Sequence, residues 1–392
     1  MDVNSRVEAG DSLRTIQIIC IIALGVAAGC IPTLQPILLG GLQAAGRISA
    51  AQIGQSAMAE AMGMGLATTF AAILLKPAGM KRIATLALII SCLANLGTAF
   101  VDHALVIVLR GLSGACSGML LWILVGMFAR AQAPGRLFAI YVTVQALVAL
   151  LLTALISRLV LPAMGPGAGY LTLALLNIAL LPAAFLVPAA YRMIDAATRG
   201  MPPLHGIIAL LSVATFLSGI MAFWVYVLPI GRARGFSTDA LNDGLLLAVL
   251  FQIAGGLTAA FSASRLPPRL VCATGALVAI CCILGVLTLE GDLILWVSLA
   301  VFAFFWMFIP PFQMPLLIGF DPSLRTAMLI GSAQLLGSAV GPLLASLVIG
   351  NDRILAAGWA AIGCMLLSVL GLIGAGAAQK MAPGKITAPL GI

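Results

Sequence analysis

Apolar stretches of span length recur along the whole chain, from residue 15 to residue 377. A helix needs about 20 apolar residues to cross the ~30 Å hydrocarbon core of a bilayer. Of the 392 residues, 62% are hydrophobic and 8% are charged, whereas soluble domains carry about 25% charged residues. Backbone groups in lipid must bond within the protein, and the polar alternation of barrel strands is missing. The sequence therefore predicts an all-α membrane protein.

Charged, glycine-rich and proline-rich breaks divide the chain into twelve predicted spans. They cover residues 15–39, 53–75, 83–101, 104–129, 137–161, 168–189, 205–230, 241–263, 270–289, 293–315, 324–349 and 354–377. The shortest break is the pair Asp102 and His103, which requires a tight turn.

Basic residues are distributed unevenly between the two sides that these spans define. With a cytoplasmic N-terminus, one side carries Arg6, Arg14, Lys76, Lys81, Arg82, Arg130, Arg136, Arg192, Arg199, Arg265, Arg269, Arg325, Lys380 and Lys385. The other side carries Arg47, Arg158, Arg232, Arg234 and Arg353. Cytoplasmic loops hold the excess of Lys and Arg. We therefore expect a multi-pass protein of the inner (cytoplasmic) membrane with both termini in the cytoplasm. The residues before the first span lack a cleavage site, so we expect that span to be retained.

Two sequence matches relate the halves of the chain. Residues 65–72 resemble residues 256–263, and the pair Arg136 and Gln145 recurs as Arg325 and Gln334. This predicts an N-terminal six-helix bundle (1–190), a cytoplasmic linker (191–203) and a C-terminal six-helix bundle with a short tail (204–392). Such halves suit alternating access. Chance similarity between helices rich in Gly and Ala is the alternative.

With twelve helices, two halves and a basic loop after the second span, the chain resembles the major facilitator superfamily. The family's loop pattern Gly-x-x-x-Asp-Arg-x-Gly-Arg-Arg is met by Gly79, Lys81 and Arg82, while Ala72 and Lys76 replace its first glycine and its acid. The resemblance implies two pseudo-symmetric six-helix bundles and a conformational latch at the three matching residues.

The fourth span adds a second motif to this resemblance. The family's pattern Arg-x-x-Gln-Gly is similar to residues 110–114, where Ser113 takes the place of the glutamine. The Gly-Pro signature of the family's exporters is missing from residues 137–161, and a partial version appears at residues 337–342. Gly337 and Gly341 would also suit close helix packing.

Glu60 and Arg110 are the charges that lie clearly inside predicted spans, at similar depths. A charge at that depth costs ~2.5–3.5 kcal/mol on insertion scales, so each should face a cavity or a partner. One hypothesis makes Glu60 a proton-coupling carboxylate that Arg110 controls. A fixed ion pair is the alternative, and Arg110 could also bind an anionic solute through its planar fork.

Uncharged polar and aromatic side chains within spans are candidates for solute contact. They are Gln35, Ser56, Gln145, Trp224, Tyr226, Gln252, Trp306 and Gln334. The structural alternatives are interhelical hydrogen bonds for the glutamines, lipid-facing packing or an interfacial belt for the aromatic residues, and a bond to its own helix for Ser56.

Several functional classes lack their motifs. There is no phosphate-binding G-x-x-x-x-G-K-[ST] loop and no G-x-S-x-G elbow, so neither an ATP-driven pump nor an enzyme is expected. We expect no cofactor, no metal and no nucleic-acid partner. The sequence favours a monomeric secondary transporter of a small organic solute, coupled to protons, with its direction unresolved. A polyspecific drug/proton antiporter and a transporter-like sensor are the alternatives.

Overall fold

The computed structural model describes residues 13–75, 78–128, 131, 134–190, 201–262, 265–323, 325–350 and 353–381. The predicted basic positions Arg6, Lys76, Arg130, Arg192, Arg199 and Lys385, and most of the predicted linker, lie outside these ranges. The helices are α1 (Thr15–Gly29), α2 (Ile31–Ala44), α3 (Ala50–Leu74), α4 (Met80–Phe100), α5 (Ala104–Phe128), α6 (Pro134–Leu155), the π-helix η2 (Ile156–Val160), α7 (Leu161–Met164), α8 (Ala168–Ala179), α9 (Leu181–Leu186), α10 (Leu204–Trp224), α11 (Val227–Ala233), α12 (Thr238–Ser262), α13 (Pro268–Thr288), α14 (Asp292–Phe308), α15 (Pro310–Phe320), α16 (Arg325–Met328), α17 (Ile330–Ile349) and α18 (Ala356–Met381).

Within the described residues, ten helical segments are long and apolar enough to cross a membrane. An eleventh is the pair α14 and α15, if that bent pair forms one span. Helix α3, which is 25 residues long and carries Glu60, is not among these segments. The predicted count of twelve is reached only if α3 is also a span. The predicted break at Asp102 is present, and His103 makes the turn with a φ of 55°. The protein is a multi-pass helical membrane protein.

Several spans are broken, and prolines lie at or near two of the breaks described next. The first span changes from α1 to α2 at Cys30, with Pro32 in the first turn of α2 and Pro36 inside it. The span of α14 and α15 bends by 45° at Ile309, directly before Pro310. Proline has no N–H and therefore removes a helical hydrogen bond. Between α10 and α11, residues Val225 and Tyr226 interrupt the helix.

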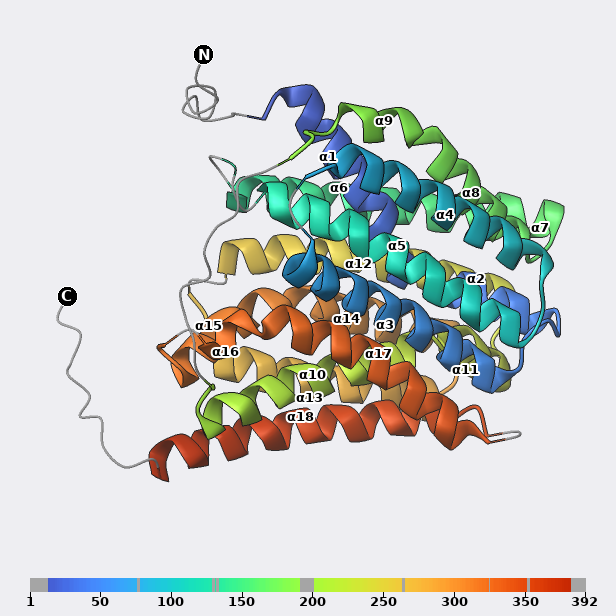
Figure 1. Ribbon diagram of the computed structural model, residues 1–392. Coiled ribbons are helices and arrows are strands. Elements are labelled where there is room, and N and C mark those ends of the chain that lie inside the picture. Colours follow the sequence, from blue (N-terminus) through green and yellow to red (C-terminus); the bar gives the residue numbers. More distant parts are fainter. Residues whose placement is uncertain are drawn as a thin grey trace, which may run out of the picture.

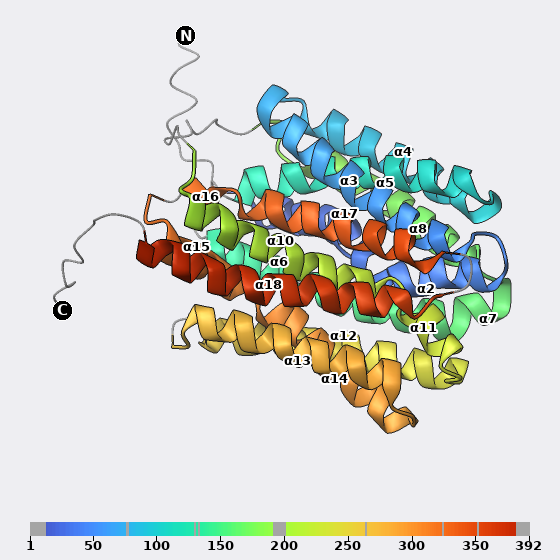
Figure 2. The same cartoon turned by 90° about the horizontal axis from the view of Figure 1, so that it is seen from below.

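The helices form two groups, α1–α9 and α10–α18. In the first group, α3 and α4 pack on α5, and α8 packs on α4. In the second group, α17 and α18 pack on α10, and α14 packs on α12. The groups meet where α3 lies beside α17, α6 beside α12 and α2 beside α11 (Figures 1 and 2). This arrangement is the one expected for two bundles, whereas the boundary at residues 191–203 remains a prediction.

Small residues allow the closest helix contacts. A Cβ on Gly114 of α5 would lie 2.0 Å from the Glu60 carbonyl oxygen of α3, and one on Gly118 would lie 2.3 Å from the Met64 carbonyl oxygen. The predicted packing role of residues 337 and 341 is also present, because a Cβ on Gly341 would lie 2.1 Å from the Ser218 carbonyl oxygen of α10. Glycine at these positions brings the backbones together.

Helix α1 begins and helix α18 ends at the same end of the bundle (Figure 1). A chain that crosses the membrane an even number of times must begin and end on the same side. Helix α2 ends and α3 begins at the opposite end, which we call the α2–α3 end.

Candidate functional site

Glu60 and Arg110 form a buried ion pair between α3 and α5. Arg110 Nη1 lies 3.2 Å from Glu60 Oε1, and the side chains are 1% (Arg110) and 3% (Glu60) exposed. The glycine contacts between α3 and α5 place the two backbones close enough for this pair. Their similar predicted depth had indicated that they could meet.

Arg110 also has neutral partners on α4 and α8. Its Nη2 donates to Asn95 Oδ1 and to Thr98 Oγ1, each at 2.9 Å. The guanidinium carbon lies 4.5 Å from the ring centroid of Tyr170. Guanidinium groups bind such amide, hydroxyl and aromatic partners favourably. Arg110 would therefore keep several partners if Glu60 lost its charge.

The Glu60 carboxylate has a second partner on another helix. Gln35 of α2 donates from Nε2 to Glu60 Oε2 at 3.2 Å, and both side chains are buried. Gln35 Oε1, Ser56 Oγ and Arg110 Nε are buried around this pair, and none of the three has a hydrogen-bond partner among the described residues. A buried polar atom without a partner costs about 1–3 kcal/mol, and such atoms often mark a functional position.

Side chains of the second group bond to backbone atoms of the first. Trp224 Nε1 donates to the Pro32 carbonyl at 3.0 Å, and Arg232 Nη1 donates to the Gly40 carbonyl at 3.0 Å. Tyr226 donates to the Ala50 carbonyl at 3.0 Å and accepts from the Gly54 amide at 2.9 Å. These bonds fasten α10 and α11 to α2 and α3.

In addition to these hydrogen bonds, an ion pair joins the two groups. Arg158 of η2 pairs with Asp243 of α12, and its Nη1 lies 4.0 Å from Asp239. Where both partners are described, the hydrogen bonds and ion pairs between the two groups all lie in the half of the bundle that carries the α2–α3 end. The structure is therefore closed at that end.

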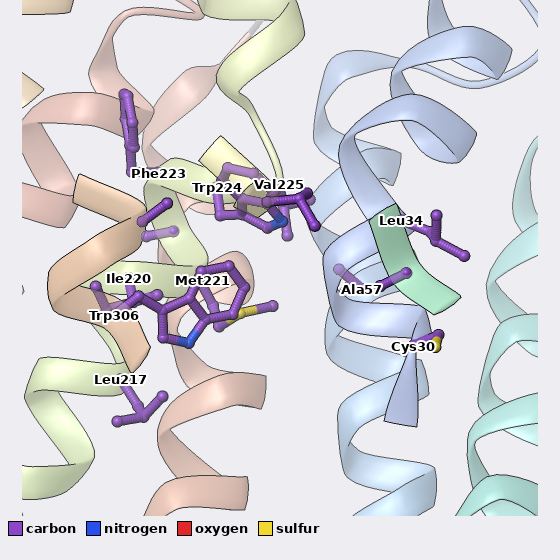
Figure 3. Close-up of a cluster of buried hydrophobic side chains, with 14 of the residues drawn as sticks. Cys30, Leu34, Ala57, Leu217, Ile220, Met221, Phe223, Trp224, Val225 and Trp306 are labelled. Atoms are coloured by element: carbon purple, nitrogen blue, oxygen red, sulfur yellow. The ribbon is translucent and has the colours of Figure 1, made fainter. Parts of the chain in front are cut away.

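The predicted aromatic candidates meet beside this contact. The ring centroids of Trp224 and Trp306 lie 5.3 Å apart at 63°. Figure 3 shows Trp224 between Trp306 on one side and the helices that carry Leu34 and Ala57 on the other. Trp224 and Tyr226 are fully buried, so in this conformation they hold the two groups together.

The predicted glutamines have different environments. Gln145 Nε2 donates to the Gly29 carbonyl at the break of the first span, at 2.9 Å, whereas Gln334 Nε2 donates to Gln313 Oε1 at 2.8 Å. Gln252 is buried, and its Nε2 has no hydrogen-bond partner within the described part of the chain. The related positions 145 and 334 thus make different contacts.

The three latch positions lie at the end opposite the α2–α3 end. Gly79 precedes α4 with a φ of 71°, and Lys81 and Arg82 are exposed. The Met80 amide donates to the Ala189 carbonyl at 3.0 Å, within the first group. Among the described residues, neither basic side chain forms an ion pair with the second group.

Sequence reasoning missed several residues of the site. Asn95 and Thr98 contact Arg110 from the preceding helix α4, and Tyr170 contacts it from α8. Asn95 and Thr98 lie on one face of α4, three residues apart, and that polar spacing was the available signal. Within the described ranges no group of three or more His, Cys, Asp or Glu residues could hold a metal ion.

Comparisons with known proteins identify structures that share this fold. No family model and no curated protein sequence matches the chain. The crystal structure of a point mutant of the nucleoside transporter NupG aligns with a TM-score of 0.73 at 12% identity, over 92% of this chain and 99% of that one. The major facilitator superfamily transporter FucP in its outward conformation aligns with a TM-score of 0.60 at 17% identity, over 92% and 99% of the two chains. The chain therefore has the fold of the major facilitator superfamily.

Proposed function

We propose that this protein is a secondary transporter that moves a small organic solute across the cytoplasmic membrane by alternating access. Its two helix groups would part at the α2–α3 end, which we place on the periplasmic side, and close at the other. Protons would drive the cycle through Glu60. The fold, which is shared with transporters, supports the class of the activity.

The contacts of the Glu60–Arg110 pair carry the coupling proposal. Glu60 has charged and amide partners, whereas Arg110 also has Asn95, Thr98 and Tyr170. Protonation of Glu60 removes the charge that Arg110 pairs with, and Asn95, Thr98 and Tyr170 remain as partners of the guanidinium. A pair whose cation has such alternative partners can break and re-form within a cycle.

The position of Gln35 connects this pair to the movement of the two groups. Gln35 lies on α2, one turn beyond Pro32, whose carbonyl accepts the bond from Trp224 of the second group. A change in the charge of Glu60 would therefore act on α2, the helix of the first group to which Trp224 of the second group bonds. A proton, like any ligand, shifts the equilibrium between two conformations only if it binds one of them more tightly than the other.

The solute would pass between the groups, near Gln252 and the pair of Trp224 and Trp306. Gln252 offers an amide nitrogen that donates to no described residue, and the tryptophans offer aromatic walls once the groups part. Polar groups on a largely apolar wall suit a small organic molecule. Because a structural neighbour transports nucleosides, nucleosides belong in the first test panel, together with organic acids and hydrophobic cations.

Transport in proteoliposomes tests the proposal. Purified protein should accumulate or release one of the panel solutes when a proton gradient is imposed, and a sodium gradient of equal size should not replace it. The direction of the flux relative to the gradient distinguishes uptake from export. Binding without flux of any solute would instead show a sensor.

Glu60→Gln separates proton coupling from solute movement. The variant should exchange labelled for unlabelled solute across the membrane without a gradient, yet fail to accumulate solute when a proton gradient is applied. Glu290→Gln, at an exposed position between α13 and α14, is the matched control and should keep both activities. Unchanged proton-driven accumulation by Glu60→Gln would show that the pair is a fixed structural one.

A further inference from the structure

A cavity of about 340 Å³ lies at the α2–α3 end between the two helix groups. Its lining is Ile37, Gly41, Ser157, Arg158, Leu161, Pro162, Leu228, Arg232, Thr238, Asp239 and Asn242. Small-molecule sites typically enclose about 300–1,000 Å³ and combine apolar walls with a few polar groups. This cavity has both, and both groups contribute to it.

Irregular helical segments form three of its walls. Ser157 and Arg158 belong to the π-helix η2, Leu228 and Arg232 to the short helix α11, and Ile37 follows Pro36 in the broken first span. A π-helical turn is rare and is frequently found at functional sites. Broken helices in membrane transporters also commonly line solute sites.

The charges around the cavity are unequally paired. Arg158 binds Asp243 closely, so its distance of 4.0 Å to Asp239 leaves that second carboxylate only loosely paired. The Asp239 side chain is 88% exposed. Arg232 donates to the Gly40 carbonyl and forms no ion pair with any residue in the described part of the chain. The cavity thus offers one guanidinium and one carboxylate for a ligand.

We propose that this cavity binds a small zwitterion, an α-amino acid with an apolar side chain. Arg232 binds the carboxylate, Asp239 binds the ammonium group, and Ile37, Leu161 and Leu228 contact the side chain. A guanidinium fork suits a carboxylate, and the two opposite charges of the wall match a ligand of no net charge. This site is separate from the Glu60 pair and does not depend on proton coupling or on transport.

Protection of an engineered thiol tests the site directly. In the Asn242→Cys variant, held in lipid nanodiscs, methyl methanethiosulfonate labels the new thiol in the cavity wall, and the parent protein gives the background from the native cysteines. Three probes share one shape: L-leucine is a zwitterion, L-leucinamide a cation and 4-methylpentanoate an anion. Leucine should slow labelling at a concentration about tenfold lower than either analogue, which corresponds to about 1.4 kcal/mol.

Two charge variants assign the two ends of the ligand. Arg232→Gln should remove the advantage of leucine over leucinamide, and Asp239→Asn should remove its advantage over 4-methylpentanoate. A structural disturbance would instead weaken all three probes together. The unsubstituted protein provides an independent measurement, because a bound ligand raises its unfolding temperature. Equal protection by the three probes, protection by none, or preferences that survive both charge variants would overturn the proposal.

Discussion

The indole N–H of Trp224 donates a hydrogen bond to the carbonyl oxygen of Pro32, at 3.0 Å, across the contact between the two helix groups. In a regular helix this carbonyl would accept from the amide four residues later. That residue is Pro36, which lies inside α2 and has no N–H. One proline thus frees the acceptor that a tryptophan of the other group uses.

Loss of this hydrogen bond should make the α2–α3 end open more often. Trp224→Phe keeps an aromatic ring and removes the donor, at a cost of about 1 kcal/mol, or a roughly fivefold change in the opening equilibrium. A membrane-impermeant thiol reagent should therefore label Ala57→Cys, which is buried beside this contact, about fivefold faster. Trp296→Phe removes an N–H that bonds within the second group, to the Ala240 carbonyl, and should leave the labelling rate unchanged. Equal acceleration by both variants would contradict the assignment.

The pair of Arg158 and Asp243 should stabilise the same closed end, but weakly. Its side chains are 41% and 45% exposed, and half-exposed pairs contribute about 0.2–1 kcal/mol. Asp243→Asn should accelerate labelling of Ala57→Cys by less than about fivefold, and high salt should abolish the difference. Asp102→Asn breaks the pair with Arg47 inside the first group and provides the control. A salt-independent effect would show that charge is not the cause.

The buried pair should respond unequally to loss of its two members. Arg110→Leu removes the cation beside Glu60 and leaves the carboxyl group buried with Gln35, at a cost of about 3–5 kcal/mol. Glu60→Gln should cost less, because Arg110 keeps Asn95, Thr98 and Tyr170. Adding Glu60→Gln to Arg110→Leu should therefore raise the thermal unfolding temperature above that of Arg110→Leu alone. A double variant less stable than either single variant would contradict the expectation that an unpaired Glu60 causes the loss.

The packing of α3 on α5 should not tolerate a methyl group. Gly114→Ala places a Cβ 2.0 Å from the Glu60 carbonyl oxygen, so the helices must separate, at a cost of about 1–3 kcal/mol. Gly256→Ala is the matched control in α12, since no neighbouring atom of a described residue lies within 4 Å of its Cβ. It should match or exceed the parent stability, because alanine favours helices over glycine by about 1 kcal/mol. Thermal unfolding in detergent compares the two, and equal losses would exclude the steric explanation.

Asp321, in the loop after α15, should stabilise the fold in a pH-dependent way. Burial by itself would raise its pKa, but hydrogen bonds from Ser323 and Thr326 outweigh it and lower the pKa of Asp321 from 3.8 to about 2. A pKa that folding lowers adds stability above its unfolded value and loses it as the pH falls toward the folded value. Asp321→Asn should thus cost about 1 kcal/mol near neutral pH, after allowance for solvent screening. The difference in unfolding temperature between the variant and the parent should shrink below about pH 4. A difference that is constant with pH would show that the ionised Asp321 carboxylate is not the cause.

The helices were predictable because each span is a local property of the sequence. The chain must satisfy its backbone within each apolar stretch, so the predicted spans agree with the helices to within a few residues at most boundaries. That Glu60 and Arg110 could meet was predictable for the same reason, from the rise of a helix. The breaks near Pro32, Pro36 and Pro310 also follow from a single residue's missing N–H.

The neighbours of those residues were not predictable, because they depend on how helices rotate and pack. The sequence by itself determined a helical membrane protein with two buried charges that require partners, since lipid solvates neither backbone nor charge. Only the tertiary structure decided that Gln35 joins Glu60, that Tyr170 lies against Arg110, and that Trp224 bonds to Pro32. Each of these contacts joins residues on different helices, and the way the helices pack sets their distance.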